Sequence, residues 1–344
     1  MNEGKPKITV LMPVYNGEKY LTEAIESILN QTNSDFEFII IDDNSTDGTA
    51  GILKRYLQKD NRIRLFNMLN QGLATSLNYG LELAQGKYIA RMDSDDISMP
   101  ERLEKQAMFM DKNPYIGVCG TWIKIFGERN YIKKYPQTHE EIWSRLLFEC
   151  PLAHPTVMIR KDMLIKNNLY YDINCKHNED YELWTRVSNI SRMANIPEGL
   201  LKYRLHNKQL TNTYPDDQVR DKFKISVKHL SQLYKITSDN ESSIHRLFFP
   251  RQNTLSIALL IKGHEWLCKL INENDRKHVF PEPEFSRLLA ERWLFLCIKA
   301  RYIGFRVLIL YWNSKLRRPV SQCLGEIMKL LINRPYKTYR KQEL

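Results

Sequence analysis

The chain has 344 residues, which suggests about two domains, and 43% of its residues are hydrophobic and 26% charged. With only 14 Gly and 14 Pro, this composition is typical of a globular protein and excludes a fibrous or largely disordered chain. Residues 1–215 carry 27 Lys and Arg against 27 Asp and Glu, so the whole net charge of +11 lies in residues 216–344.

The first part of the chain alternates apolar strands with amphipathic helices. Strands are predicted at 8–14, 36–41, 63–66 and 87–92, and helices at 20–29, from the cap-type residues 43–45 to about 57, and at 73–84. Strands and helices that alternate at this spacing predict a parallel sheet covered by helices on both faces.

The alternation loosens after Pro100. Helices are predicted at 101–111, 139–148 and 179–188, and strands at 118–126, 156–159 and 200–205. Beyond Tyr214 the pattern is almost wholly helical, with breaks at Pro250, Pro281, Pro283 and Pro319. The pattern change and the charge step together predict two domains, 1–215 and 216–344.

The cysteines and the N-terminus predict a compartment. The six cysteines are far apart and form no CxxC pair, which is typical of small buried residues in a reducing environment (Cys119, Cys150, Cys175, Cys268, Cys297 and Cys323). The apolar run 8–14 is too short for a signal-peptide core or a membrane span. We therefore expect a cytoplasmic chain, or one attached to a membrane from the cytoplasmic side.

Three of the predicted strands end in polar residues, at 15–16, 42–45 and 93–96. Ligands of open α/β sheets bind at such carboxyl ends. Neither a GxGxxG nor a GxxxxGK[ST] motif is present there, which argues against a dinucleotide oxidoreductase and a P-loop enzyme. Carboxylates repel phosphate unless a divalent cation lies between them, so these acidic strand ends favour a metal–nucleotide substrate.

A series of motifs within residues 7–210 is specific in number, order and spacing. They are VLMPVYN at 10–16, QT at 31–32, IDDNSTDGT at 41–49, GKYI at 86–89, DSDD at 93–96 followed by MP, HPTV at 154–157, ED at 179–180 with LW at 183–184 and Arg186, and YRLH at 203–206. Together they resemble the family 2 inverting glycosyltransferases. The resemblance implies a GT-A fold, an α/β architecture with a mixed sheet and helices on both faces, here followed by a helical C-terminal region.

The resemblance also implies a set of residues that bind a nucleotide sugar: Pro13, Tyr15, Asn16, Glu18, Asp43, Asp93, Arg204 and His206. Tyr15 would stack on the base, and Asp43 would accept a hydrogen bond from the imide of uracil. The alternatives are a half-buried core aromatic for Tyr15 and a helix N-cap for Asp43.

By the same resemblance, Asp93 and Asp95 form a DxD motif that binds Mn²⁺ or Mg²⁺. Asp95 would bind the metal directly, Asp93 would contact the sugar or ribose beside it, and His206 would help to hold the metal and the diphosphate. Oxygen ligands suit these hard cations. The alternative for the acidic run is a polar turn before the helix that begins near Pro100.

An inverting transfer needs a base opposite the leaving group. The resemblance gives that role to Asp180, with Glu179 beside it in the acceptor pocket, whereas the alternative is a pair of acids that the helix dipole favours. His154 and Pro155 would shape the acceptor side without a chemical step. The QxxRW motif of processive members is incomplete, because Leu289 replaces the Gln ahead of Arg292 and Trp293. This departure predicts the addition of a single sugar.

We therefore expect an inverting, metal-dependent hexosyltransferase that moves one sugar from a UDP-sugar to a hydroxyl of a lipid-linked glycan. The pathways expected are lipopolysaccharide, O-antigen, capsule or exopolysaccharide assembly. A sugar nucleotidyltransferase is the enzymatic alternative, and a protein that binds nucleic acid through the basic segment is the other, although no nucleic-acid motif is present.

The basic C-terminal region suggests a location for the enzyme. Residues 284–312 mix Trp, Leu and Phe with five Lys and Arg, a pattern that favours an interfacial helix on an anionic membrane over a spanning one. The expected location is the inner face of the bacterial inner membrane, as a peripheral protein. The alternative is that these helices pack on the catalytic domain or form a homodimer.

Overall fold

The computed structural model describes residues 4–206, 215–250 and 254–317. The chain divides into two compact units: a sheet unit of Met1–Ile142 and Cys150–Tyr214, and a helical unit of Trp143–Glu149 and Pro215–Leu344. The segment Trp143–Glu149, which we expected in the first domain, belongs to the helical unit. The reason is that Leu147 and Phe148 are buried in the hydrophobic cluster of the C-terminal helices.

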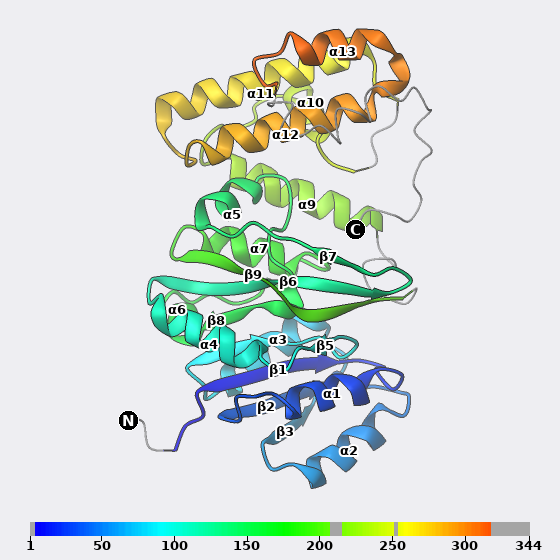
Figure 1. The fold of residues 1–344 in the computed structure, drawn as a ribbon, viewed down its shortest axis with the longest axis vertical. Helices are drawn as coiled ribbons and strands as arrows, with labels where there is room; N and C mark the ends of the chain where they lie inside the picture. Colours follow the sequence, from blue (N-terminus) through cyan, green and yellow to red (C-terminus); the bar gives the residue numbers. More distant parts are fainter. Residues whose placement is uncertain (1–3, 207–214, 251–253, 318–344) are drawn as a thin grey trace. The chain divides into compact units, whose positions relative to one another are not determined.

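The first half of the sheet unit has the predicted alternation (Figure 1). Strands β1 (Ile8–Val14), β2 (Phe36–Asp42), β3 (Ile63–Asn67) and β4 (Tyr88–Arg91) are parallel, in the order β3-β2-β1-β4. Helices α1 (Leu21–Leu29), α2 (Thr49–Lys59) and α3 (Leu73–Leu83) connect them. The strand ends that carry the motifs therefore meet at one edge of the sheet.

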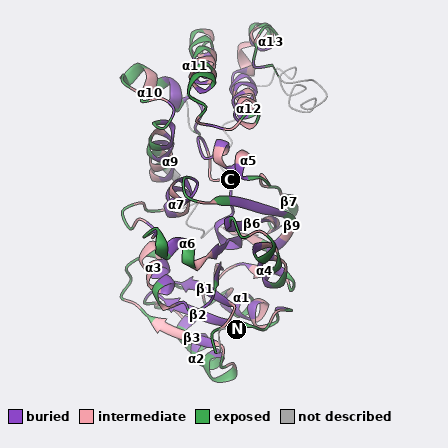
Figure 2. Ribbon diagram, turned by 90° about the vertical axis from the view of Figure 1, so that its left-hand side faces the viewer, coloured by how far each residue is buried: buried purple, intermediate pink, exposed green. Residues whose placement is uncertain are grey.

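Strand β1 is buried on both faces, as Figure 2 shows for the centre of the sheet. Its alternate residues Ile8, Val10 and Met12 pack in one cluster with α1 and α2. On the other face α3 approaches so closely that a Cβ on Gly80 would lie 2.2 Å from Leu11 Cδ1. Because parallel strands are covered on both sides, they form continuous apolar runs rather than alternating ones.

The second half makes the sheet mixed, so the expected fold class is confirmed. Strand β8 (Met158–Arg160) is antiparallel to β4 and to β6 (Ile116–Gly127), while β9 (Arg192–Leu205) is parallel to β6 and antiparallel to β5 (Ile97–Ser98). The short strand β7 (Tyr131–Lys133) pairs with β6. Helices α4 (Arg102–Lys112), α6 (Lys161–Lys166) and α7 (Glu179–Val187) complete the unit.

Several predicted boundaries in this half are wrong. The strand predicted at 156–159 starts later because His154–Thr156 forms a 3-10 turn, and the strand predicted from 200 already begins at Arg192. Helix α5 (His139–Arg145) ends before 148. The short elements α6, β5 and β7 were not predicted, since each is too short to show a hydrophobic period.

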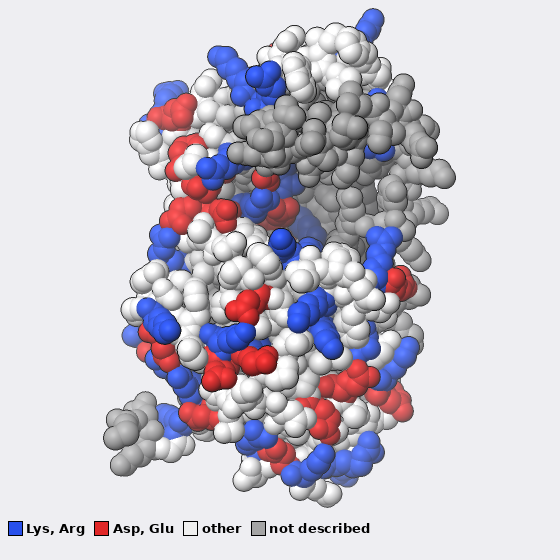
Figure 3. Space-filling view, in the orientation of Figure 1, with Lys and Arg blue, Asp and Glu red and all other residues white. Residues whose placement is uncertain are grey.

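The surface of the sheet unit agrees with its balanced charge. On the face drawn in Figure 3, Lys and Arg side chains are interspersed with Asp and Glu. No large area of a single charge is visible on that face of the unit, as expected from equal numbers of acidic and basic residues in 1–215.

The helical unit contains α9 (Pro215–Leu230), α10 (Asp239–Arg246), α11 (Ile257–Lys277), α12 (Glu284–Lys299), a 3-10 turn (Arg301–Ile303) and α13 (Phe305–Trp312). The predicted interfacial helix over 284–312 is wrong in form. The chain breaks between α12 and α13, and the large apolar side chains of α12 are buried in the core of the unit (Phe285, Leu288, Leu289, Trp293 and Leu296). Pro319 and Cys323 lie outside the described residues.

Two further expectations can be compared with the fold. Within the described ranges, every helix is too short or too polar to cross a membrane. Of the five described cysteines only Cys119 and Cys297 are buried, so the expectation that all are core residues is wrong for Cys150, Cys175 and Cys268.

Candidate active site

The loops that follow β1 and β2 are joined by reciprocal hydrogen bonds. The backbone N–H of Asn16 donates to Ser45 Oγ at 2.9 Å, and the backbone N–H of Thr46 donates to Asn16 Oδ1 at 2.8 Å. The carboxylate of Glu18 accepts from the N–H of Gly48 at 3.0 Å. Asn16 and Glu18 thus hold two of the motif loops against each other, while Asn16 adopts a left-handed backbone with φ of 50°.

Tyr15 and Asp43 lie beside these loops, and the structural alternatives considered for both are wrong. The Tyr15 side chain is 50% exposed, so it is no core aromatic. Asp43 is buried and does not cap α2, whose N-cap is Gly48. Its two oxygens instead accept the N–H groups of Gln71 and Gly72 at 2.9 and 2.8 Å. Pro13, by contrast, is buried within β1.

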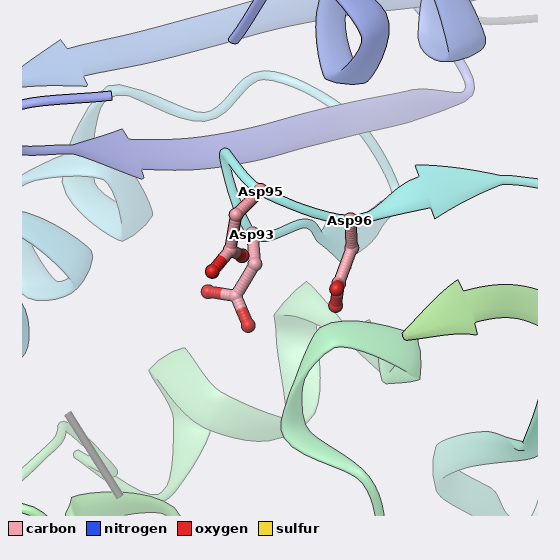
Figure 4. A group of neighbouring side chains, drawn as sticks. All are labelled: Asp93, Asp95 and Asp96. Carbon is pink, nitrogen blue, oxygen red and sulfur yellow. The ribbon is translucent and has the colours of Figure 1, made fainter. Parts of the chain in front are cut away.

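The turn after β4 gathers three carboxylates. Asp93, Asp95 and Asp96 each offer an oxygen within 4.8 Å of the others, and their side chains point to the same side of the turn (Figure 4). Asp96 Oδ1 accepts the backbone N–H of Arg204 at 2.9 Å, whereas its buried Oδ2 has no hydrogen-bond partner among the described residues. Burial, together with the charges of Asp95 and Asp93, raises the pKa of Asp96 well above its usual value. This oxygen-rich donor set fits a hard divalent cation.

The end of β9 and the residue after it lie against this turn. His206 Nε2 is 2.9 Å from Asp95 Oδ2, and the ring of Tyr20 lies 5.0 Å from the imidazole. Arg204 donates through Nε to the backbone oxygen of Asp95 at 2.9 Å and through Nη2 to Glu23 at 2.7 Å. The fold therefore brings Arg204 and His206 next to the acidic turn, from which they are far apart in the sequence.

A second group of carboxylates, Glu179 and Asp180, lies at the start of α7. Glu179 is buried, and this burial together with the charge of Asp180 raises its pKa to about 7. Asp180 is less buried, and its Oδ2 lies 3.5 Å from the thiol of Cys150. The helix dipole favours negative charge at this end, but it does not offset the cost of burying Glu179.

The raised pKa of Glu179 predicts a pH-dependent stability. The folded chain holds this proton more tightly than the unfolded chain, so the contribution is complete below pH 4.5 and is lost as the pH rises to about 7. The variant Glu179→Gln cannot ionise, and its Tm relative to the wild type should therefore rise between pH 5 and pH 8. Calorimetry across this range tests the expectation, which a constant difference in Tm would contradict.

The structure adds three residues to the site that the sequence reasoning did not assign to it: Arg91, Cys150 and Tyr171. Arg91, at the end of β4, forms an ion pair with Asp93. His154, which we expected only to shape the acceptor side, lies 3.0 Å through Nε2 from the hydroxyl of Tyr171. Arg91 stands two positions before the DxD motif, which is a usable signal. Cys150 and Tyr171 carry no local signal, because only the tertiary fold brings them here.

Comparisons with known proteins identify the family of this chain. The model of Glycosyl transferase family 2 matches residues 9–171. The O-antigen biosynthesis glycosyltransferase WbnJ of Escherichia coli is 43% identical over 209 residues, which cover 58% of this chain and 80% of that protein.

Two solved structures share the fold. Staphylococcus aureus TarS 1–349 in complex with UDP-GlcNAc gives a TM-score of 0.58 at 22% identity, over 83% of this chain and 86% of that chain. The mannosyltransferase PcManGT from Pyrobaculum calidifontis in complex with GDP-Man and Mn²⁺ gives 0.50 at 14% identity, over 96% of this chain and 88% of that chain. Because WbnJ is 43% identical and 80% of its length is covered, the chain belongs to glycosyl transferase family 2 and is a glycosyltransferase.

Proposed function

We propose that this enzyme transfers one sugar from a UDP-sugar, with inversion, to a hydroxyl of a glycan acceptor. The observation that carries the proposal is a site with two separate groups of carboxylates. One, at the end of β4, is suited to the charged donor, and the other, at the start of α7, is suited to a base. Binding of UDP-GlcNAc by TarS, which shares the fold, supports a UDP donor.

Tyr15 and Asp43 bind the nucleoside in this proposal. The exposed ring of Tyr15 offers a face for the base to stack on. Asp43 already accepts two backbone N–H groups, but a carboxylate has about four lone-pair sites. A free lone pair therefore remains for the imide N–H of uracil, and Asn16 and Glu18 act by holding the two loops in place.

Asp95, Asp93 and His206 would hold a divalent cation, with Mn²⁺ in the complex of PcManGT as support. Such an ion offsets the negative charge that develops on the leaving diphosphate. His206 already contacts Asp95, and Arg204 stabilises the turn through its hydrogen bonds to Asp95 and Asp96. The buried Oδ2 of Asp96, which has no hydrogen-bond partner in the part of the chain that the structure describes, adds to the fit of this donor set.

Asp180 acts as the base. Its carboxylate takes the proton of the acceptor hydroxyl as that oxygen forms a bond to C1 of the donor sugar, and the bond from C1 to the β-phosphate oxygen breaks with release of UDP. Attack opposite the leaving group inverts the configuration at C1. Glu179 lies beside it in the proposed acceptor pocket, and His154 Nδ1 lies 3.9 Å from Glu179 Oε1.

A titration with nucleotide sugars tests the donor. We expect one or more of UDP-Glc, UDP-Gal, UDP-GlcNAc and UDP-GalNAc to raise the Tm of the chain in the presence of Mn²⁺, with GDP-mannose as the matched control. Stabilisation by GDP-mannose alone would overturn the UDP assignment. Release of pyrophosphate from UTP and a sugar phosphate would instead favour the nucleotidyltransferase.

The name of WbnJ supports an acceptor in O-antigen or related surface polysaccharide assembly, and such glycans on lipid carriers would require a membrane surface. One face of α13 suits it: Phe305, Ile309 and Trp312 are 74%, 46% and 45% exposed. From Arg292 to Arg317 the sequence has no acidic residue but six Lys and Arg. Each cation near an anionic leaflet contributes about 1 kcal/mol.

Flotation with phosphatidylglycerol vesicles tests this surface. The full chain should float at low salt and be released at high salt, whereas the triple variant Phe305→Ser, Ile309→Ser and Trp312→Ser should stay at the bottom. Ile165→Ser, which changes an exposed residue of the sheet unit, is the matched control and should float.

If the triple variant floats too, membrane binding through α13 is wrong. If the triple substitution turns a dimer into a monomer, this face joins two copies of the chain instead. Binding of oligonucleotides in place of vesicles would favour the nucleic-acid alternative.

A further inference from the structure

Arg91 is a buried cation beside the acidic turn. It is the last residue of β4, and the residue is only 3% exposed. Its backbone is held on both sides, because its N–H donates to the oxygen of Val157 and its oxygen accepts from Arg102. The position of its guanidinium is therefore set by the sheet rather than by a loop.

The guanidinium contacts the donor-side group of carboxylates. Nη1 forms an ion pair with Asp93 Oδ2. Burial lowers the pKa of Arg91, but the charge of Asp93 and its hydrogen bond outweigh burial, and the pKa is raised overall. Arg91 is therefore charged and directly bound to Asp93.

The hydrogen bonds of Arg91 are not those of a structural arginine. Its Nε is buried without a hydrogen-bond partner in the described part of the chain, and such an unsatisfied group costs about 1–3 kcal/mol. Arg102, on α4 next to it, is fully buried too, yet its Nε donates to Gln106 at 3.0 Å and its Nη2 to the backbone of Arg91 at 2.6 Å. Arg102 is therefore held by hydrogen bonds to neutral groups, whereas the guanidinium of Arg91 is held through the site carboxylate Asp93.

We propose that Arg91 is a positioning residue for sugar transfer, which holds one carboxylate oxygen of Asp93 and so fixes the direction of the other. This inference rests on the proposed function. Because Oδ2 of Asp93 is taken by Arg91, Oδ1 is left for the cation or the sugar. The direction of Oδ1 then decides how well the donor is aligned for attack at C1.

The variants Arg91→Met and Arg91→Lys test this role in the full chain with Mn²⁺. We expect Arg91→Met to lower kcat about 10²-fold, which is the effect of a misplacement near 1 Å. The Kd for UDP should stay within about twofold of the wild-type value, because the nucleoside site of Tyr15 and Asp43 is unchanged. Arg91→Lys keeps the charge but loses the planar fork, so it should recover part of kcat.

Arg102→Met is the matched control. It removes an equally buried arginine but leaves Gln106 and a backbone oxygen without their donor, so it should lower Tm more than Arg91→Met does. Equal losses of UDP affinity and kcat in Arg91→Met, or a kcat equal to that of the wild type, would overturn the positioning role. A wild-type chain that turns over no UDP-sugar would overturn the proposed function, and the role of Arg91 with it.

Discussion

Replacing Asp180 by Asn should lower kcat by about 10²–10⁴-fold while the Kd for UDP stays nearly unchanged, since this is the usual loss when a general base is removed. An amide keeps the shape of the side chain but cannot take the proton of the acceptor hydroxyl. Asp180 belongs to α7, whereas the expected UDP contacts belong to the loops after β1, β2 and β4, so binding and chemistry should separate. Single-turnover transfer and UDP titration measure the two quantities.

Two neighbours provide the controls for Asp180. Cys150→Ser replaces the thiol that lies 3.5 Å from Asp180 Oδ2 and should retain most of the activity, because the hydroxyl can occupy the same place. Glu179→Gln should have a smaller effect than Asp180→Asn. If Asp180→Asn transfers sugar at nearly the wild-type rate and Glu179→Gln does not, Glu179 is the base.

Removal of the divalent cation should abolish transfer, and Asp95→Ala should have the same effect without a chelator. EDTA should stop the wild-type enzyme, and added Mn²⁺ or Mg²⁺ should restore it. The reason is that, among the described residues, no arginine or lysine forms an ion pair with Asp95 and could replace the cation. Asp95→Ala should lose affinity for both Mn²⁺ and UDP, since the diphosphate would meet the remaining carboxylates unshielded. Calorimetric titration of each ligand measures this.

Asp162→Ala is the matched control for Asp95→Ala, because it removes an exposed carboxylate of α6 that lies outside the acidic turn. It should bind Mn²⁺ and UDP as the wild type does. Full turnover in EDTA would contradict the role of a metal. Loss of UDP affinity with intact Mn²⁺ binding would move the cation away from Asp95.

Much of the sheet unit follows from local sequence. Strands β1 to β4 are short apolar runs that end in polar motifs, and parallel strands buried on both faces require such runs. Because the carboxyl ends of parallel strands lie at one edge of a sheet, the sequence predicts that the motifs at Tyr15, Asp43 and Asp93 lie together. The family and the fold class were likewise expected from the resemblance that these motifs carry.

Local sequence thus predicted the chemistry of the site residues and the end of the sheet where they meet. The contacts of their side chains emerge only from the folded chain: Arg91 binds Asp93, Cys150 lies beside Asp180, and Asn16 and Glu18 bind the neighbouring loop. It also placed the apolar face of α12 inside the helical unit rather than on a membrane. The physical reason is that periodicity shows that a face is apolar, whereas its partner depends on contacts between residues distant in the chain.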